Sequence, residues 1–211
     1  ISVDGSQIQS MNSRGVVAVS RPDHVITKEE LARAEQAATA IQLEANRQIL
    51  QVITRSYSVD GQEGIVDPVG MNGLKLEVDT HIVTGSTPAI KNLENAVFRS
   101  GIQINNQLIV PLAAARTVIT KKQLEQGVAL VHIGSETTGL VIYLEGRLTY
   151  STIFPFGSSN ITKDLVYGLR TSMDIAEKIK LKYGVATKPN HRNQEKIDLA
   201  QFGGKIGRAH V

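Results

Sequence analysis

The residues Gly127–Tyr150, GVALVHIGSETTGLVIYLEGRLTY, are the most informative about the fold of this chain. Its apolar run Val128–Ile133 has the length and residue types of a buried strand, and Gly139–Leu144 is a second run of the same kind. The dipeptide Glu145-Gly146 separates that second run from a third strand, as in a tight two-residue hairpin. The pattern therefore predicts three consecutive strands joined by two short turns.

The first of these turns has the composition of an anion-binding loop. Gly134, Ser135, Thr137 and Thr138 stand between the first two strands. Such small residues let backbone amides and hydroxyl groups crowd around a phosphate. Gly134 and Gly139 could also serve only to make the turn, but the strand–turn–strand setting favours contact with a nucleotide.

Two helices are expected after the third strand. Capping residues open the first, over Gly157–Leu169, and the second covers Ser172–Tyr183. Glu177 and Lys180 lie three residues apart on one face of the second helix. They could be an ordinary surface pair worth about 0.3–0.5 kcal/mol, or they could contact a ligand.

The residues up to 102 predict a small α+β unit. Its expected elements are strands over Val3–Gln9 and Gly15–Val19 with a turn over 12–15, a capped helix from Thr27, strands over Ile49–Ser58 and Leu74–Val83, and a helix from Thr87 to near Gly101. Apolar and polar residues alternate along Leu74–Val83, which is typical of a sheet with one solvated face. We therefore expect His81, on the polar side, to be solvated.

Next come a strand over Ile104–Val110, a helix over Pro111–Ile119 and a polar connection over Thr120–Gln126. The expected division places the α+β unit in residues 1–102, a closing strand and helix in 103–120, and a second lobe in 121–205. Residues 206–211 read as the conceptual translation of a sequencing adapter. We expect this tail to be an artefact and leave it out of the fold prediction, and we expect the chain to be cut at its front, because it begins without Met.

Composition excludes several classes of function. The net charge is only +3 with the basic residues spread along the chain, and five tyrosines and four phenylalanines are the only aromatic residues, so a nucleic-acid groove is not expected. The absence of cysteine excludes disulfides, thiolate catalysis and cysteine zinc sites and is compatible with a reducing cytosol. No run of about 18 apolar residues is present that could span a membrane.

Over nearly all of residues 1–185 the chain resembles FtsA, the family of bacterial actin-like cell division proteins. The string over Asp67–Gly85, which contains DPVGMNG and LEVDTHIVTG, is the most specific part of the resemblance. The other matching strings are Gly5–Ile8, Asn12–Val19, Val59–Ile65, Val110–Ala113, Gly168–Arg170 and Ala176–Gly184. The resemblance implies an α/β fold: an actin-like (ribonuclease H-like) ATPase lobe fragment, preceded by an inserted α+β subdomain.

The same resemblance implies a function. Family members are ATP-binding, filament-forming adaptors that anchor FtsZ to the cytoplasmic membrane and recruit later divisome proteins. In the family the inserted subdomain faces neighbouring subunits and divisome partners. ATP with Mg²⁺ would be the cofactor, and the protein would lie at the cytoplasmic face of the inner membrane at the division site. In the family the FtsZ-binding subdomain, the membrane helix and the first phosphate loop lie beyond this segment. We therefore expect the isolated chain to bind ATP weakly or not at all.

The resemblance also assigns residues to a nucleotide site. The residues implied are Gly134, Ser135, Thr137 and Thr138 at the phosphate hairpin, Gly157 at the next helix start, and Glu177 and Lys180 at the ribose and adenine edge. His132 replaces the family's acidic residue, and Glu136 places a carboxylate beside the phosphates, which repels them unless a metal or a lysine neutralises it. We therefore assign no catalytic residue and no protein metal ligand, and expect at most a weak ATPase.

Two other classes remain open. A related actin-like pilus-assembly adaptor carries a similar inserted subdomain and would bind inner-membrane pilus components in place of FtsZ. An actin-fold ATPase or sugar kinase would need an acidic catalytic residue at the hairpin, which His132–Glu136 lacks at the expected place.

Overall fold

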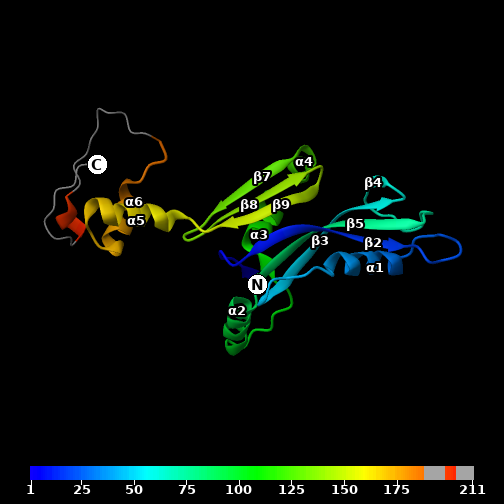
Figure 1. Cartoon of the computed structure of the whole chain (residues 1–211). Helices are drawn as coiled ribbons and strands as arrows, with labels where there is room; N and C mark the ends of the chain where they lie inside the picture. The colour runs from blue at the N-terminus through cyan, green and yellow to red at the C-terminus, as the bar shows by residue number, and fades with distance from the viewer. Residues whose placement is uncertain (188–197, 203–211) are drawn as a thin grey trace. The chain divides into compact units, whose positions relative to one another are not determined.

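A computed structural model of the chain describes residues 1–187 and 198–202 (Figure 1). These residues form two compact units. The larger unit consists of residues 1–132 and 137–154, and the smaller unit of residues 133–136, 155–187 and 198–202. The tail over 206–211 lies outside the described residues. The division predicted at residues 102, 120 and 205 concerns the subdomains of the complete fold and stays a prediction.

The main sheet of the larger unit is antiparallel with the strand order β2-β5-β3-β4. Its strands are β2 (Gln9–Ala18), β3 (Arg47–Val59), β4 (Gln62–Ile65) and β5 (Lys75–Ser86). Because β5 pairs with both β2 and β3, it lies inside the sheet. It is buried on both faces, so the expectation of one solvated face is wrong.

Different elements cover the two faces of β5. The helix α1 (Lys28–Thr39) packs against one face, on the side of Leu76 and Val78 (Figure 1). On the other face His81 is 1% exposed, and its ring nitrogens contact Asn12 Oδ1 at 2.7 Å and Ser151 Oγ at 2.8 Å. Ser151 belongs to β9 (Arg147–Phe154), a strand of a separate three-stranded sheet. The prediction of a solvated His81 is therefore wrong, and burial lowers the pKa of this imidazole to about 4.

The strand β2 runs without interruption through the predicted turn over 12–15. Gly15 pairs with Val78 of β5, and its bare Cα faces α1. A Cβ atom on Gly15 would lie 2.0 Å from the carbonyl oxygen of Ala34 and 2.6 Å from the amide nitrogen of Ala38. This glycine therefore allows a helix to approach a strand closely, and it does not make a turn.

The two predicted helix starts in this region are confirmed. Thr27 and Glu30 form the capping box at the start of α1, with the Thr27 amide donating to Glu30 Oε2 at 3.0 Å. The helix α2 (Thr87–Arg99) follows β5 directly, with Pro88 in its first turn.

The larger unit also contains a two-stranded sheet. β1 (Ser2–Val3) pairs in parallel with β6 (Leu108–Ile109), which runs into α3 (Val110–Val118). Residues 121–126 form a short helix, α4 (Lys121–Gln126), capped by Thr120, so the predicted polar connection is wrong. Reciprocal hydrogen bonds between Thr120 and Gln123 stabilise this single turn.

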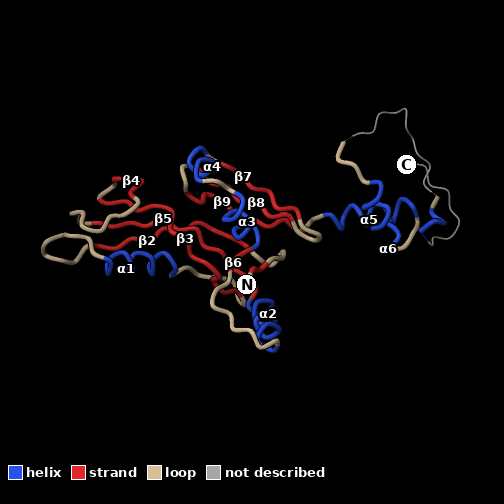
Figure 2. The backbone as a smooth tube through the Cα atoms, turned by 180° about the vertical axis from the view of Figure 1, so that it is seen from behind, coloured by secondary structure: helices blue, strands red, loops and turns tan. Residues whose placement is uncertain are grey.

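The three strands that the opening stretch predicts are confirmed. They are β7 (Val128–Ile133), β8 (Thr138–Leu144) and β9 (Arg147–Phe154), in the order β7-β8-β9. Glu145 and Gly146 have φ of 51° and 76°, as a type I′ hairpin turn requires. Figure 2 shows that these three strands form a sheet separate from the four-stranded sheet. The core between them contains Val3, Ile8, Val83, Ile90, Ile109, Leu112, Val141, Leu148 and Ile153.

The smaller unit is built on two packed helices, α5 (Ser158–Leu169) and α6 (Met173–Tyr183). Ala176 and Ile179 of α6 are buried. A short 3-10 helix, Leu199–Phe202, brings the Phe202 ring into edge-to-face contact with Tyr183 at a centroid distance of 6.2 Å.

Candidate functional site

The turn after β7 packs directly against the start of α5 in the smaller unit. The backbone amides of Ser158 and Ser159 donate to the carbonyl oxygens of Gly134 and Ser135, each at 2.9 Å. A Cβ atom on Gly157 would lie 2.4 Å from the Ser135 oxygen and 2.5 Å from the Gly134 oxygen. Only glycine therefore lets this helix start lie so close to the turn.

This packing leaves donor groups of the turn available. Within the described part of the chain, the amides of Ser135 and Glu136 donate no backbone hydrogen bond. The turn carbonyls face α5, and the two unused amides can receive an anion. Clusters of successive backbone N–H groups are known anion-binding features.

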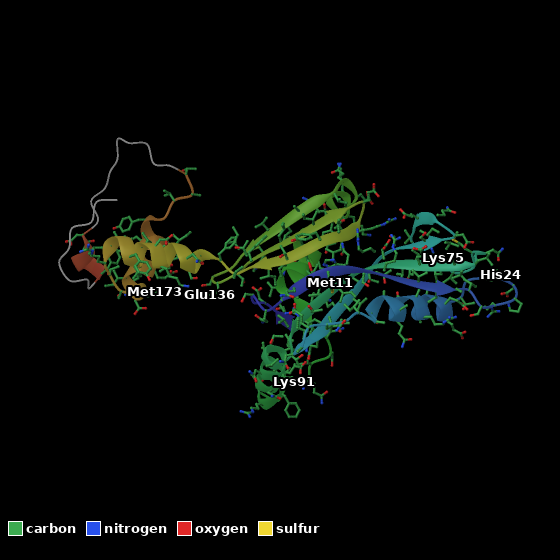
Figure 3. The ribbon with its side chains drawn as sticks, viewed as in Figure 1. Met11, His24, Lys75, Lys91, Glu136 and Met173 are labelled. Atoms are coloured by element: carbon green, nitrogen blue, oxygen red, sulfur yellow. The ribbon has the colours of Figure 1, made fainter. Side chains whose placement is uncertain are left out.

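The carboxylate of Glu136, labelled in Figure 3, has a cationic neighbour. Lys163 Nζ of α5 lies 3.6 Å from Glu136 Oε2, and both side chains are about half exposed or more. The pair is therefore weak. It still provides the lysine that could neutralise Glu136 beside bound phosphates. Nothing in the sequence pattern pointed to Lys163, because its role depends on α5 starting against the turn.

Glu177 and Lys180 do not form an isolated surface pair. Lys180 Nζ lies 2.7 Å from Glu177 Oε2, and it also donates to the Thr162 hydroxyl at 2.9 Å and to the Ser158 carbonyl at 3.3 Å. The Thr162 hydroxyl, which is 1% exposed, donates to Glu177 Oε2 at 2.6 Å. The Lys180 side chain is 14% exposed and that of Glu177 is 43% exposed. We call Ser158, Thr162, Glu177 and Lys180 the α5–α6 polar cluster.

Electrostatics keep the cluster charged. The hydrogen bond from Lys180 and then that from Thr162 lower the pKa of Glu177 below its ordinary value. The carboxylate is therefore ionised at neutral pH and keeps an exposed edge that can accept hydroxyl hydrogen bonds. Sequence reasoning missed Thr162. Its signal is a polar β-branched residue inside a helix, which becomes informative only once α6 is placed against α5.

Thr137 and Thr138 belong to the larger unit, at the start of β8. Both are buried, and the Thr137 hydroxyl donates to Asp4 Oδ2 at 2.7 Å. The same carboxyl group accepts from the Gly5 amide at 2.8 Å. Of the seven predicted site residues, Gly134, Ser135, Gly157, Glu177 and Lys180 thus lie in the smaller unit and the two threonines in the larger one. The roles of all seven in nucleotide contact stay predictions.

Metal ligands are scarce. In residues 1–187 and 198–202, no group of three or more His, Cys, Asp or Glu side chains is arranged to hold a metal ion. His132 has a buried Nδ1 atom that finds no hydrogen-bond partner among the residues that the structure describes, and Glu136 pairs with Lys163. Magnesium commonly binds to one or two carboxylates together with substrate phosphates. These residues do not provide a magnesium site of their own.

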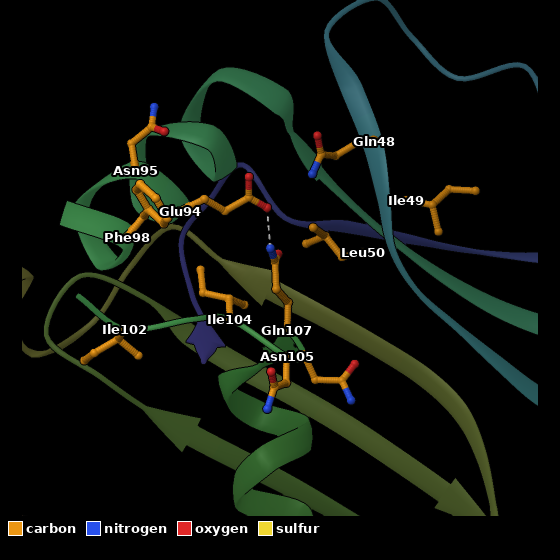
Figure 4. A pocket seen from close by; sticks show the side chains of 11 residues that line it. Gln48, Ile49, Leu50, Glu94, Asn95, Phe98, Ile102, Ile104, Asn105 and Gln107 are labelled. Atoms are coloured by element: carbon orange, nitrogen blue, oxygen red, sulfur yellow. Dashed lines mark hydrogen bonds between the residues drawn. The ribbon is translucent and has the colours of Figure 1, made fainter. Parts of the chain in front are cut away.

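The larger unit contains a hollow between α2, the start of β3 and residues 102–107 (Figure 4). Its volume is about 520 Å³, and the Gln107 side-chain amide donates to Glu94 across it. Glu94 is the only ionisable side chain among its eleven lining residues, which are otherwise amides and apolar groups such as the exposed Phe98.

Every helix in the described part of the chain is too short or too polar to span a membrane.

Two family profiles match the chain. The profile described as "SHS2 domain inserted in FTSA" matches residues 5–84, and the one described as "Cell division protein FtsA" matches residues 129–210. Together they cover more than half of the chain.

Curated relatives agree with these profiles. The chain is 34% identical to the "Cell division protein FtsA" of Neisseria meningitidis serogroup B over 206 residues, covering 98% of this chain and 49% of the relative. It is 36% identical to the protein of the same name from Bacillus subtilis over 203 residues, covering 96% and 46%. The chain thus spans about half the length of the curated relatives that it matches.

One solved structure has a similar fold. A chain of the "PilM-PilN type IV pilus biogenesis complex" superimposes with a TM-score of 0.55 at 15% identity, covering 83% of this chain and 48% of that one. At this identity the likeness shows the fold alone. The expected fold class is confirmed: an actin-like ATPase fold with an inserted SHS2 domain. By its two profile matches and its relatives, this chain belongs to the FtsA family of cell division proteins.

Proposed function

We propose that the smaller unit is part of an ATP site. The observation that carries this proposal is the packing of the Gly134–Glu136 turn on Gly157, which occupies the turn's carbonyl groups and leaves the amides of Ser135 and Glu136 available. Lys163 supports it by placing a cation beside the carboxylate that would otherwise repel phosphate.

Each group has a role in this proposal. The turn amides would hold phosphate oxygens. The exposed edge of Glu177 would accept hydrogen bonds from the ribose hydroxyls, and Lys180, held by Thr162, would lie at the adenine edge. In the complete fold, both lobes would contact the phosphate chain of the same ATP molecule. Mg²⁺ would arrive with the nucleotide, because the described residues provide no carboxylate cluster for it.

We further propose the adaptor function for the complete protein. Membership in a family of cell division proteins supports a filament-forming role that anchors FtsZ at the cytoplasmic face of the inner membrane and recruits divisome proteins. The SHS2 domain would contribute partner contacts, and the amide-rich hollow of Figure 4 has a lining suited to a polypeptide. Because the chain spans about half of its relatives, these activities are proposed for the whole protein.

A titration of the ¹⁵N-labelled chain with MgATP tests the nucleotide site. We expect millimolar ATP to shift the amides of Ser135, Glu136 and Gly157, and Lys180→Ala to reduce these shifts. The matched control is Lys91→Ala, an exposed lysine of α2 in the larger unit (Figure 3). Shifts scattered over the basic surface, with equal effects of the two variants, would remove the support for the site. Micromolar affinity would contradict the expectation of weak binding.

A further inference from the structure

A hollow of about 690 Å³ in the larger unit gathers four cationic side chains, Arg55, Arg116, Lys121 and Arg147, with the single carboxylate of Glu145. Among the described residues, none of the four cations forms an ion pair within 4.0 Å. We call this hollow the arginine pocket. Four cations against one carboxylate leave an excess of positive charge that a ligand could neutralise.

Arg55 stands at a β-bulge in β3 and lines the pocket. The register of β3 against β5 shifts between Thr54 and Ser56, so that an extra residue stands in β3 at this point. Ile53 and Arg55 lie two residues apart and both line the pocket, whereas the Thr54 hydroxyl between them donates to Glu35 of α1 on the other face of the sheet. The extra residue interrupts the pairing of β3 with β5 beside the pocket, and bulges are over-represented next to functional sites.

The Arg55 guanidinium is not fully satisfied. Its Nε atom is buried and has no hydrogen-bond partner within the described residues. Leaving a buried donor of a charged group unpaired is costly, and such a group calls for an explanation. Because Arg55 lines the pocket, a bound oxyanion would offer this guanidinium an acceptor once its Nε turns toward the hollow.

The other cations come from three further elements. Arg147 opens β9 and donates from Nη2 to the Gly64 carbonyl at 2.8 Å. Arg116 of α3 and Lys121 of α4 are exposed at the rim. The Arg116 charge also opposes the rise that burial imposes on the pKa of Tyr143, which places it close to that phenol.

Most of the remaining lining residues are apolar. Leu112, Ala115 and Leu148 form part of the wall, and Tyr143 adds an aromatic ring. A volume of this size, an apolar lining and a few converging polar groups are the usual features of a small-molecule site. Arginine binds phosphate through paired N–H donors, and an excess of about three positive charges suits a dianion better than a single carboxylate.

We propose that the arginine pocket binds an organic phosphate, with its oxyanion on Arg55 and Arg147 and its apolar body against Leu112, Leu148 and Tyr143. Arg116 and Lys121 attract the ligand at the rim. All of the lining residues belong to the larger unit. The site therefore goes beyond the proposed nucleotide site and does not depend on it.

Calorimetric titration of the chain at low salt tests the proposal. The probes are phenyl phosphate, inorganic phosphate and the neutral analogue phenol. We expect phenyl phosphate to bind at least about tenfold more tightly than either of the other two, because it alone engages both the cations and the apolar wall. Arg55→Gln should weaken its binding about tenfold or more.

Three further variants control for misfolding, for effects of charge outside the pocket and for the nucleotide site. Arg116→Gln changes an exposed rim residue, so it should weaken binding severalfold while the melting temperature stays unchanged. Arg99→Gln changes an exposed arginine of α2 outside the pocket and should leave binding unchanged. Glu177→Gln should also leave phenyl phosphate binding unchanged, even if it alters ATP binding.

An experiment with lipid vesicles identifies whether the phosphate belongs to a lipid or to a free molecule. Flotation with phosphatidylglycerol vesicles, compared with phosphatidylcholine vesicles, shows whether a lipid headgroup can occupy the pocket. Binding to the former that depends on Arg116 would support a lipid phosphate, and phenyl phosphate binding alone would support a free one. Phenyl phosphate affinity that is equal to that of phosphate and insensitive to Arg55→Gln and Arg116→Gln would overturn the proposal. So would tighter binding of a hexaglutamate peptide, which would indicate an acidic polypeptide.

Discussion

Replacing Gly157 with alanine is expected to loosen the turn from α5. The new Cβ atom would lie 2.4 Å from the Ser135 oxygen, about 1 Å inside ordinary van der Waals contact, and the clash is with backbone that cannot rotate away. The φ of −160° is extended backbone that alanine adopts freely, so steric overlap is the whole cause.

The magnitude follows from two contributions. Overpacking of this kind costs about 1–3 kcal/mol. Moving the turn by 1 Å also weakens the hydrogen bonds from the Ser158 and Ser159 amides, each worth about 0.5–1.5 kcal/mol. We therefore expect the opening free energy of the α5–α6 pair to fall by about 2–4 kcal/mol, measured by amide hydrogen exchange of α5 and α6.

Gly168→Ala provides a matched control in the same helix. Apart from the helix backbone and the two adjoining residues, no atom of the described residues lies within 4 Å of the position that a Cβ on Gly168 would take. Alanine should therefore stabilise α5 by up to about 1 kcal/mol, through its higher helix propensity. A Gly157→Ala variant that exchanges as slowly as the wild type would refute the reasoning, and so would two variants that change stability in the same direction.

Four further predictions concern the polar groups. Thr162→Val should destabilise the α5–α6 pair by about 1–3 kcal/mol, measured by hydrogen exchange, because Glu177 and Lys180 lose a shared partner; unchanged exchange would contradict this role. Because the pKa of Glu177 is lowered in the folded state, the stability that it contributes is present above its ordinary pKa of 4.5 and should be lost as the pH falls below that value; Glu177→Gln should flatten this dependence in hydrogen-exchange data. The His81 imidazole should titrate near pH 4 in NMR spectra, so its contribution to stability is present above pH 6.5 and is lost as the pH falls from 6.5 to 4; a midpoint near 6.5 would show that the ring is solvated. Lys163→Ala should weaken MgATP binding and addition of Glu136→Gln should restore it, as NMR titration can show; independent effects would contradict the compensation.

Features that depend on neighbours along the chain were predicted correctly. The Glu145-Gly146 turn needs two residues of positive φ, and the capping box at Thr27 needs a glutamate three residues later. Both requirements are visible as short strings, because the atoms that satisfy them lie within a few residues of each other.

Features that depend on distant elements were missed or misread. Gly15 looked like a turn residue because its partner, the carbonyl of Ala34, lies in a helix that follows later in the chain. His81 looked solvated because β9, which supplies Ser151, covers a face that an alternating pattern assigns to water.

The candidate site divides in the same way. The glycines and the Glu177–Lys180 spacing are local signals, so the hairpin, the two helices and most of the residues assigned to ligand contact could be predicted from short strings of residues. The contacts that those residues make depend on how the helices and the turn pack. Thr162 joins Glu177 to Lys180, and Lys163 reaches Glu136, because α5 packs against α6 and begins at the turn. Hydrogen bonds and ion pairs act over a few ångströms, so the packing of elements far apart in the sequence determines which of them form.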